Sequence, residues 1–169
     1  MVDTIIGARR IYIVGFRSSS FLAGYLNFYF RLIFDNVTLV NGGAAGSFDQ
    51  LFRVSKDVDV VIGICFPRYS ELALKTIQFA RDRGATIVGV TDSEMSPINQ
   101  MSSNSLLVRS EMISFVGSLA APMSMLNALI LPWPTRRAQT SPRRSPNSST
   151  SGSASTFSAR SKMNKSIVV

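Results

Sequence analysis

Residues 11–20 have the sequence IYIVGFRSSS, in which an apolar strand segment runs through one glycine and three serines into a helical pattern. The N-terminus of a helix presents backbone N–H groups, and its dipole favours negative charge there. No second glycine follows Gly15 at position 17, so the stretch matches neither the dinucleotide-binding fingerprint nor a Walker loop. We predict that this turn binds an anion such as a phosphate group; the alternative is an ordinary serine N-cap.

Strand-like and helix-like segments alternate along the chain up to residue 108. Strands are expected at residues 11–14, 37–40, 57–64, 86–90 and 105–108. The third and fourth contain continuous apolar runs, which are typical of parallel strands buried on both faces. Helices are expected from about residue 21, from Ser47 in a capping box with Gln50, and from Ser70 to a final Gly84. This order predicts an α/β fold whose parallel sheet is covered by helices on both faces.

The 169-residue chain contains one cysteine, Cys65, and no histidine. The missing histidines exclude Ser-His-Asp and Cys-His catalysis, histidine metal sites and the commonest general base. A single cysteine forms no internal disulfide and has no metal-ligand spacing, so we expect a small buried residue. The N-terminus lacks the basic and apolar regions of a signal peptide. We therefore expect a cytoplasmic protein with neither a metal nor a cofactor.

The formal net charge of +8 originates in the C-terminal part of the chain. Seven of the 18 basic residues and none of the ten acidic residues lie beyond Leu131, which leaves eleven bases against ten acids in residues 1–131. Residues 132–169 are rich in Ser, Pro and Arg and have almost no apolar periodicity, so we expect them to be disordered. They are either an unselected extension, such as a shifted reading frame, or a basic tail that contacts nucleic acid through charge.

Residues 112–131 carry no charge, which makes a transmembrane segment one interpretation. Pro122 and several polar residues within the segment favour instead a final helix that packs beside the sheet. We therefore expect no contact with a membrane.

Three loops follow strands of the expected sheet, at residues 15–20, 65–70 and 91–97. Because ligands of open α/β sheets bind outside the carboxyl ends of the strands, these loops should lie together. The first loop supplies Ser18 and Ser19, and the second supplies Arg68 and Ser70. The alternatives are a surface ion pair for Arg68 and helix caps for Ser47 and Ser70. No pair of carboxylates has a spacing that indicates catalysis.

The motifs GFRSSS at 15–20, FPRYS at 66–70, and GATIVGVTDS at 84–93 with Ser-Pro at 96–97 resemble the SIS (sugar isomerase) domain. The similarity covers about residues 5–131 and is greatest to the variant at the C-terminus of RpiR-type bacterial transcription regulators. The resemblance implies that residues 1–131 form a three-layer sandwich, whose five-stranded parallel sheet has a flavodoxin-like strand order. It also implies a homodimer or homotetramer that binds a sugar phosphate.

The same resemblance assigns roles to individual residues. The first-loop serine of the family corresponds to Ser19, with Ser18 adjacent, and the last hydroxyl of the second loop corresponds to Ser70. Enzymatic members usually have Ser-x-Ser-Gly-x-Thr in the second loop, so two hydroxyls are missing here, and we expect Arg68 to substitute for them. Ser47 is expected to assist, and the 91–97 loop to face the sugar.

We predict from these features a phosphosugar-binding sensor domain of an RpiR-type regulator, without catalytic residues, which acts through ligand-dependent changes in assembly. Such regulators carry an N-terminal helix-turn-helix domain, whereas this chain begins almost at the first strand. We therefore expect no direct sequence-specific DNA binding by this chain alone. A sugar-phosphate aldose–ketose isomerase is the alternative, which the absence of histidine disfavours. A degenerate remnant that binds nothing is a third interpretation.

Overall fold

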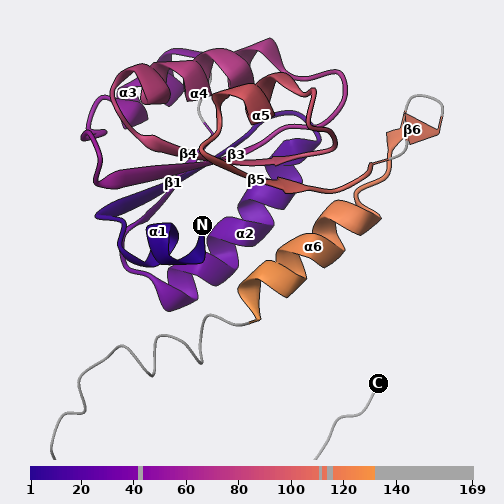
Figure 1. Ribbon diagram of the computed structural model, residues 1–169, viewed down its shortest axis with the longest axis horizontal. Coiled ribbons are helices and arrows are strands. Elements are labelled where there is room, and N and C mark those ends of the chain that lie inside the picture. Colours follow the sequence, from indigo (N-terminus) through magenta and orange to yellow (C-terminus); the bar gives the residue numbers. More distant parts are fainter. Residues whose placement is uncertain (42–43, 111, 114–115, 132–169) are drawn as a thin grey trace, which may run out of the picture.

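The computed structural model describes residues 1–41, 44–110, 112–113 and 116–131, and its centre is a parallel sheet (Figure 1). Its five strands are β1 (Arg10–Gly15), β2 (Val37–Val40), β3 (Asp59–Ile64), β4 (Thr86–Thr91) and β5 (Asn104–Leu107). They lie in the order β2-β1-β3-β4-β5, and every neighbouring pair is parallel. The predicted α/β fold and its flavodoxin-like strand order are confirmed.

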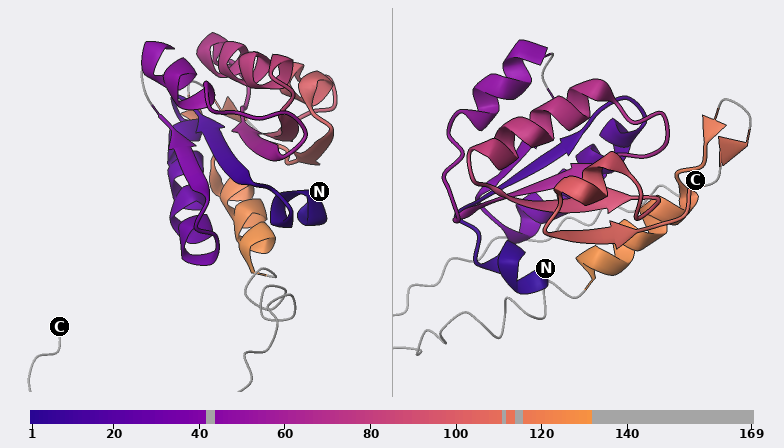
Figure 2. Two further views of the ribbon diagram at one scale, coloured as in Figure 1. Left: turned by 90° about the vertical axis from the view of Figure 1, so that its left-hand side faces the viewer. Right: turned by 45° about the horizontal axis from the view of Figure 1, so that its top comes forward.

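Helices cover both faces of the sheet (Figure 2). One face carries α1 (Val2–Ile6), α2 (Ser19–Ile33) and α6 (Ala120–Ile130). The other face carries α3 (Ala44–Leu51), α4 (Glu71–Asp82) and α5 (Pro97–Met101). Gly84 follows the C-cap of α4 with a φ of 85°, as expected for the glycine that ends a helix.

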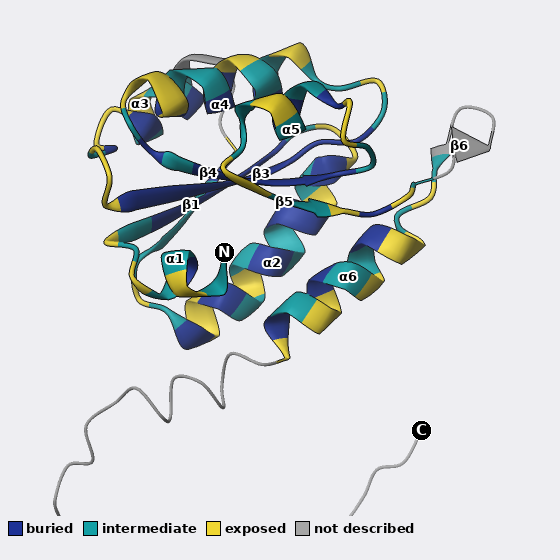
Figure 3. Cartoon of the chain, viewed as in Figure 1, coloured by how far each residue is buried: buried dark blue, intermediate teal, exposed yellow. Residues whose placement is uncertain are grey.

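The central strands are buried on both sides because their side chains alternate between two apolar clusters. In β1, Ile11 and Ile13 belong to the cluster beneath α2, whereas Tyr12 and Val14 belong to the cluster beneath α4. All six residues of β3 are buried (Figure 3). This double burial explains why the strand sequences are continuously apolar rather than alternating.

The third helix begins earlier than expected. It starts at Ala44, so Ser47 is buried within α3 and the predicted capping box is wrong. Alanine has the highest helix propensity, and the two alanines at 44–45 extend the helix upstream of the serine.

The final helix is shorter than the expected span of residues 112–131. β6 (Met112–Ile113) and β7 (Val116–Gly117) pair as an antiparallel hairpin, and α6 starts only at Ala120. The paired residues Ile113 and Val116 are β-branched, and Gly117 disfavours a helix. Among the residues that the structure describes, no helix is long and apolar enough to cross a membrane. The tail at 132–169 lies outside the described residues.

A buried carboxylate lies at the N-terminal end of β3. Asp59 is fully buried and accepts two hydrogen bonds from the Arg9 guanidinium, at 2.9 and 2.8 Å, and one from the Ser55 N–H at 2.8 Å. Burial by itself would raise the pKa of Asp59, but these hydrogen bonds and the charge of Arg9 outweigh it and lower the pKa. The pair thus joins the start of β1 to the start of β3.

The opposite end of β1 meets α2 in very close contact. A Cβ atom on Gly15 would lie 2.7 Å from the Ser19 carbonyl oxygen and 2.8 Å from the Ala23 Cβ. Both distances are far below van der Waals contact. Glycine at position 15 therefore allows the first turn of α2 to rest directly on the end of β1.

We expect Asp59→Asn to lower the free energy of unfolding by about 2 kcal/mol at neutral pH, because it removes charge-assisted hydrogen bonds from a buried site. The pKa of Asp59 is lower in the folded than in the unfolded protein. The contribution of Asp59 to the free energy of unfolding is therefore complete above the pKa that it has in the unfolded protein. It is lost as the pH falls through the lower pKa that it has in the folded protein. Urea unfolding at about pH 7 and about pH 3 should show a smaller difference from wild type in acid. Asp57→Asn, at an exposed carboxylate, is the control, and an equal loss in both variants contradicts the prediction.

We expect Gly15→Ala to lower the free energy of unfolding by about 2 kcal/mol, because the added methyl group must push α2 away from the strand. Gly24 in the same helix is the matched control, since no atom lies within 4 Å of the position that its Cβ would occupy. Gly24→Ala should raise the free energy of unfolding by up to about 1 kcal/mol through helix propensity. Urea denaturation of both variants measures the effects, and a change of the same sign in both refutes the close-contact interpretation.

Candidate functional site

The strand order changes direction at β1, which has β2 on one side and β3 on the other. The loops after β1 and β3 lead to helices on opposite faces of the sheet, α2 and α4. Such a divergence opens a crevice at the carboxyl ends of the strands, where ligands of open α/β folds bind. A small pocket lies at this place, lined by Phe16, Arg17, Ser18, Ser19, Cys65, Phe66, Pro67, Arg68 and Ser70. We refer to it as the strand-end pocket.

Four of the five predicted binding residues line the strand-end pocket, namely Ser18, Ser19, Arg68 and Ser70. The sheet register brings them together: Gly15 and Ile64, the last residues of β1 and β3, are paired neighbours, so both loops start side by side. Ser47 is not among the lining residues and lies buried within α3.

The first loop presents hydroxyl groups more than backbone donors. The N–H groups of Ser19, Ser20 and Phe21 donate to the carbonyls of residues 16, 17 and 18, at 3.2, 3.1 and 3.4 Å. These three N–H groups are hydrogen-bonded within the loop, whereas we expected the N–H groups of this helix N-terminus to point outward, free to bind an anion. Ser18 is the N-cap of α2, but its side chain makes no capping hydrogen bond. Its exposed hydroxyl, next to the buried Ser19, is placed to contact a ligand.

Both loops turn sharply at an arginine. Arg17 has a φ of 56° and Arg68 a φ of 64°, in the left-handed region that favours glycine. Both side chains are exposed at the edge of the strand-end pocket. Left-handed backbone at non-glycine residues costs about 1–3 kcal/mol and is found mainly at functional sites. The two arginines add positive charge beside the serines.

Ser70 is the N-cap of α4, and its Oγ accepts a weak hydrogen bond from the Ala73 N–H at 3.5 Å. The alternative interpretation of Ser70 as a helix cap is therefore confirmed. It is compatible with ligand binding, because a hydroxyl that accepts one hydrogen bond still has its own proton to donate.

Cys65 is buried, as expected, beside the serines. Burial raises the pKa of its thiol, an effect that the Ser70 backbone N–H opposes and the charge of Asp92 reinforces. The thiol therefore stays protonated and is a poor nucleophile at neutral pH.

The third predicted loop, residues 91–97, contributes none of the residues that line the strand-end pocket. It contacts the second loop instead, because the Tyr69 hydroxyl donates to Asp92 Oδ1 at 2.8 Å. Sequence reasoning missed this pair, although both residues lie within the motifs that carry the family resemblance. The expectation that the 91–97 loop faces the ligand directly finds no support in the lining of the pocket.

A second hollow continues the strand-end pocket toward the β6–β7 hairpin. It shares Ser18, Phe66, Pro67 and Arg68 with the pocket and adds Ser110, Gly117 and Leu119. The Ser110 hydroxyl donates to the Ser118 carbonyl at 3.0 Å and so closes the base of the hairpin. The two hollows adjoin through these four shared residues, and serines line both of them.

No acidic residue is among the described residues that line these two hollows. Glu71 pairs with Lys75 at 2.6 Å, and Glu94 is exposed in the third loop. Within the described ranges, no three histidine, cysteine or acidic side chains gather as metal ligands. The chemistry of the site is therefore that of hydroxyl donors and cations.

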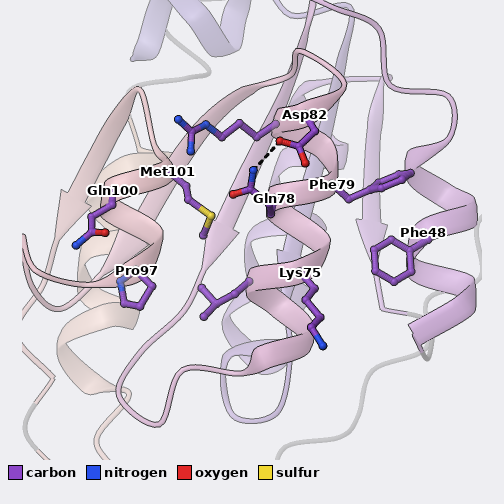
Figure 4. A pocket seen from close by; sticks show the side chains of 10 residues that line it. Phe48, Lys75, Gln78, Phe79, Asp82, Pro97, Gln100 and Met101 are labelled. Atoms are coloured by element: carbon purple, nitrogen blue, oxygen red, sulfur yellow. Dashed lines mark hydrogen bonds between the residues drawn. The ribbon is translucent and has the colours of Figure 1, made fainter.

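A larger hollow lies between α3, α4 and α5 (Figure 4). Its walls are largely apolar, with Phe48, Phe79 and Met101 among them, and Gln78 Nε2 donates to Asp82 Oδ1 at 2.6 Å at its rim. It lies among helices rather than at the strand ends, and it lacks the serines of the strand-end pocket. We therefore place the candidate site at the strand ends.

The family model of the SIS domain matches residues 4–132 of this chain. A curated relative, an uncharacterised HTH-type transcriptional regulator of Clostridium perfringens, is 25% identical over 131 residues. The match covers 76% of this chain and 46% of the relative, so the chain spans about half the length of the curated protein that it matches.

Solved structures share the fold. The sugar isomerase domain of an RpiR transcription factor from Sphaerobacter thermophilus superposes with a TM-score of 0.76 at 21% identity, over 82% of this chain and 76% of that domain. The Vibrio vulnificus NanR protein, complexed with ManNAc-6P, superposes with a TM-score of 0.71 at 16% identity, over 82% of this chain and 53% of NanR.

Proposed function

The chain belongs to the SIS domain family, and we propose that it is a phosphosugar-binding sensor domain of the kind found in RpiR-type transcription regulators. One observation carries the proposal: serines from two strand ends line one pocket together with two arginines, and the described lining residues include no carboxylate. Hydroxyl donors and cations bind a phosphate dianion, which a nearby carboxylate would repel. The complex of the structurally similar NanR with ManNAc-6P supports a sugar phosphate as the ligand.

We further propose that the phosphate lies at the end of the site formed by Ser18, Ser19 and Ser70, with Arg68 beside it. The sugar would then extend into the second hollow, toward Ser110 and Leu119. This orientation puts the phosphate against Ser19 and Ser70, which line only the strand-end pocket, and the sugar beside Ser110 and Leu119, which line only the second hollow.

The proposed activity is binding without turnover. Aldose–ketose isomerisation needs a base that moves a proton between neighbouring carbons. The chain has no histidine, the described residues that line the two hollows include no carboxylate, and the Cys65 thiol is protonated. We propose that the domain acts in the cytoplasm and that recognition of DNA does not reside in residues 1–131.

A second copy of the chain is the partner that we propose for the outer face of α2. Phe21, Phe28 and Leu32 are 72%, 61% and 71% exposed, and their spacing of i, i+7 and i+11 places them in one stripe. Arg31 is the one charged residue within α2, so the stripe fits an apolar partner rather than a charged one. An identical stripe related by a two-fold axis would cover it. Phe21 is two positions from Ser19, so such a dimer would form beside the strand-end pocket and couple ligand binding to assembly.

We expect at least one of glucose 6-phosphate, fructose 6-phosphate and ManNAc-6P to raise the thermal midpoint of the full-length chain by roughly 5 °C or more when saturating. Free glucose and free fructose should have no effect, because they lack the phosphate. Ser19→Ala should weaken binding about tenfold, through loss of a hydrogen bond to a charged group. Calorimetric titration measures the dissociation constants.

The controls for this prediction are Ser47→Ala, in α3, and Ser20→Ala, whose hydroxyl donates to the Arg17 carbonyl at 2.6 Å. Both should lose less affinity than Ser19→Ala. Equal losses in all three variants would contradict the placement of the phosphate. The absence of a thermal shift with every sugar phosphate would refute the proposed function, and isomer formation from a stabilising ligand would favour the enzyme.

We expect Phe28→Glu to raise the dissociation constant of the dimer at least tenfold, because it places a charge in the centre of an apolar interface. Sedimentation velocity over a range of concentrations measures the shift toward the monomer. Met95→Glu, at a residue that is 80% exposed in the third loop, is the control and should leave the assembly unchanged. A wild-type chain that stays monomeric, with and without ligand, would refute the proposed interface.

A further inference from the structure

We propose that Tyr69 and Asp92 are a positioning pair, which holds the second loop of the strand-end pocket in its ligand-binding shape. The inference rests on the proposed function of that pocket. Neither residue lines the pocket, so the pair would act on the ligand through the loop rather than by contact.

Tyr69 lies between two residues that do line the pocket, Arg68 and Ser70. Its own side chain is directed elsewhere: the ring packs against the apolar cluster beneath α4, and the hydroxyl donates to Asp92 Oδ1 at 2.8 Å. Asp92 directly follows β4, and the same oxygen accepts a hydrogen bond from the buried Thr91 Oγ1 at 3.2 Å. The side chain of Tyr69 thus fastens the middle of the loop to the end of the neighbouring strand.

The backbone of the second loop is anchored at its start and adopts an unfavourable conformation at Arg68. The Cys65 N–H donates to the Val90 carbonyl at 3.0 Å at the start of the loop, and Pro67 has no N–H to donate. Arg68 then adopts its left-handed conformation, with a φ of 64°. A strained conformation of this kind persists only where the surrounding structure holds it. The hydrogen bond of the next residue is placed to do so.

The Tyr69 hydroxyl can donate its hydrogen bond to Asp92 independently of pH in the physiological range. Burial, together with the hydrogen bond to Asp92, raises the pKa of Tyr69 to about 12. The phenol therefore remains protonated, and able to donate, throughout the physiological range of pH. If the hydroxyl is removed, Arg68 and Ser70 should spread over several positions. A ligand would then have to order the loop as it binds, which lowers affinity without removing a direct contact.

The test is a double-mutant cycle on the full-length chain, titrated with the sugar phosphate that gives the largest thermal shift among the three named above. We expect Tyr69→Phe and Asp92→Ala each to raise the dissociation constant about tenfold. The double variant should lose no more than either single variant, because both remove the same interaction. Asp92→Asn is the matched control: its side-chain carbonyl still accepts from Tyr69, so it should bind within about twofold of wild type. Unliganded melting curves establish that each variant is folded at the titration temperature.

Unchanged affinity in Tyr69→Phe would overturn this inference while leaving the proposed function intact. Losses that multiply in the double variant would also overturn it, because the residues would then act independently. Binding by Asp92→Asn that is as weak as that of Asp92→Ala would show that the charge, rather than the hydrogen bond, matters. A wild-type chain that binds none of the sugar phosphates would refute the proposed function and this inference together.

Discussion

The contact between Gly15 and the first turn of α2 determines where the functional parts of this molecule lie. Because a Cβ at Gly15 would overlap the Ser19 carbonyl, the helix can rest on the end of β1 only when the strand ends in glycine. That contact holds Ser18 and Ser19 at the switch point of the sheet. The same helix carries the apolar stripe of Phe21, Phe28 and Leu32 on its outer side. The candidate binding residues and the proposed interface therefore lie on one helix, which is the basis of the proposed coupling between ligand and assembly.

Both loops of the strand-end pocket contain a residue in the left-handed backbone conformation. Its first loop uses its backbone donors internally, in hydrogen bonds to residues 16–18, and presents hydroxyl groups instead. In its second loop the Tyr69 hydroxyl donates to Asp92, the contact that we propose holds the loop in shape. Left-handed arginines stand in both loops. None of the described residues that line the pocket is a histidine or a carboxylate, which supports the proposal of binding without turnover.

Local patterns predicted most of the architecture. The central strands are buried on both faces, so their sequences contain continuous apolar runs, such as residues 60–62 in β3. These runs predicted the positions of β3 and β4 correctly. Parallel strands end at one edge, so serines after two of them were bound to be near each other, and Ser19 and Ser70 do line one pocket. Local patterns predicted the wrong element where the same residues were compatible with two structures. The capping box expected at Ser47 is wrong because the helix begins at Ala44. Residues 112–113 pair with residues 116–117 as strands, within an uncharged segment that is equally compatible with a helix.

The sequence by itself determined the α/β fold and the order of its elements. It also determined the residue types at the strand ends, because periodicity, glycine positions and short connections act within a few residues of each other. Tertiary structure alone decided which of those residues share a pocket. Ser47, a good candidate by type, is buried within α3, and Asp92 accepts a hydrogen bond from Tyr69, 23 residues away in the chain. The tertiary structure also determined that a second hollow extends the pocket to Ser110 and Leu119. Such contacts depend on the register of strands and on the direction of each side chain, and neither quantity is encoded in a local pattern.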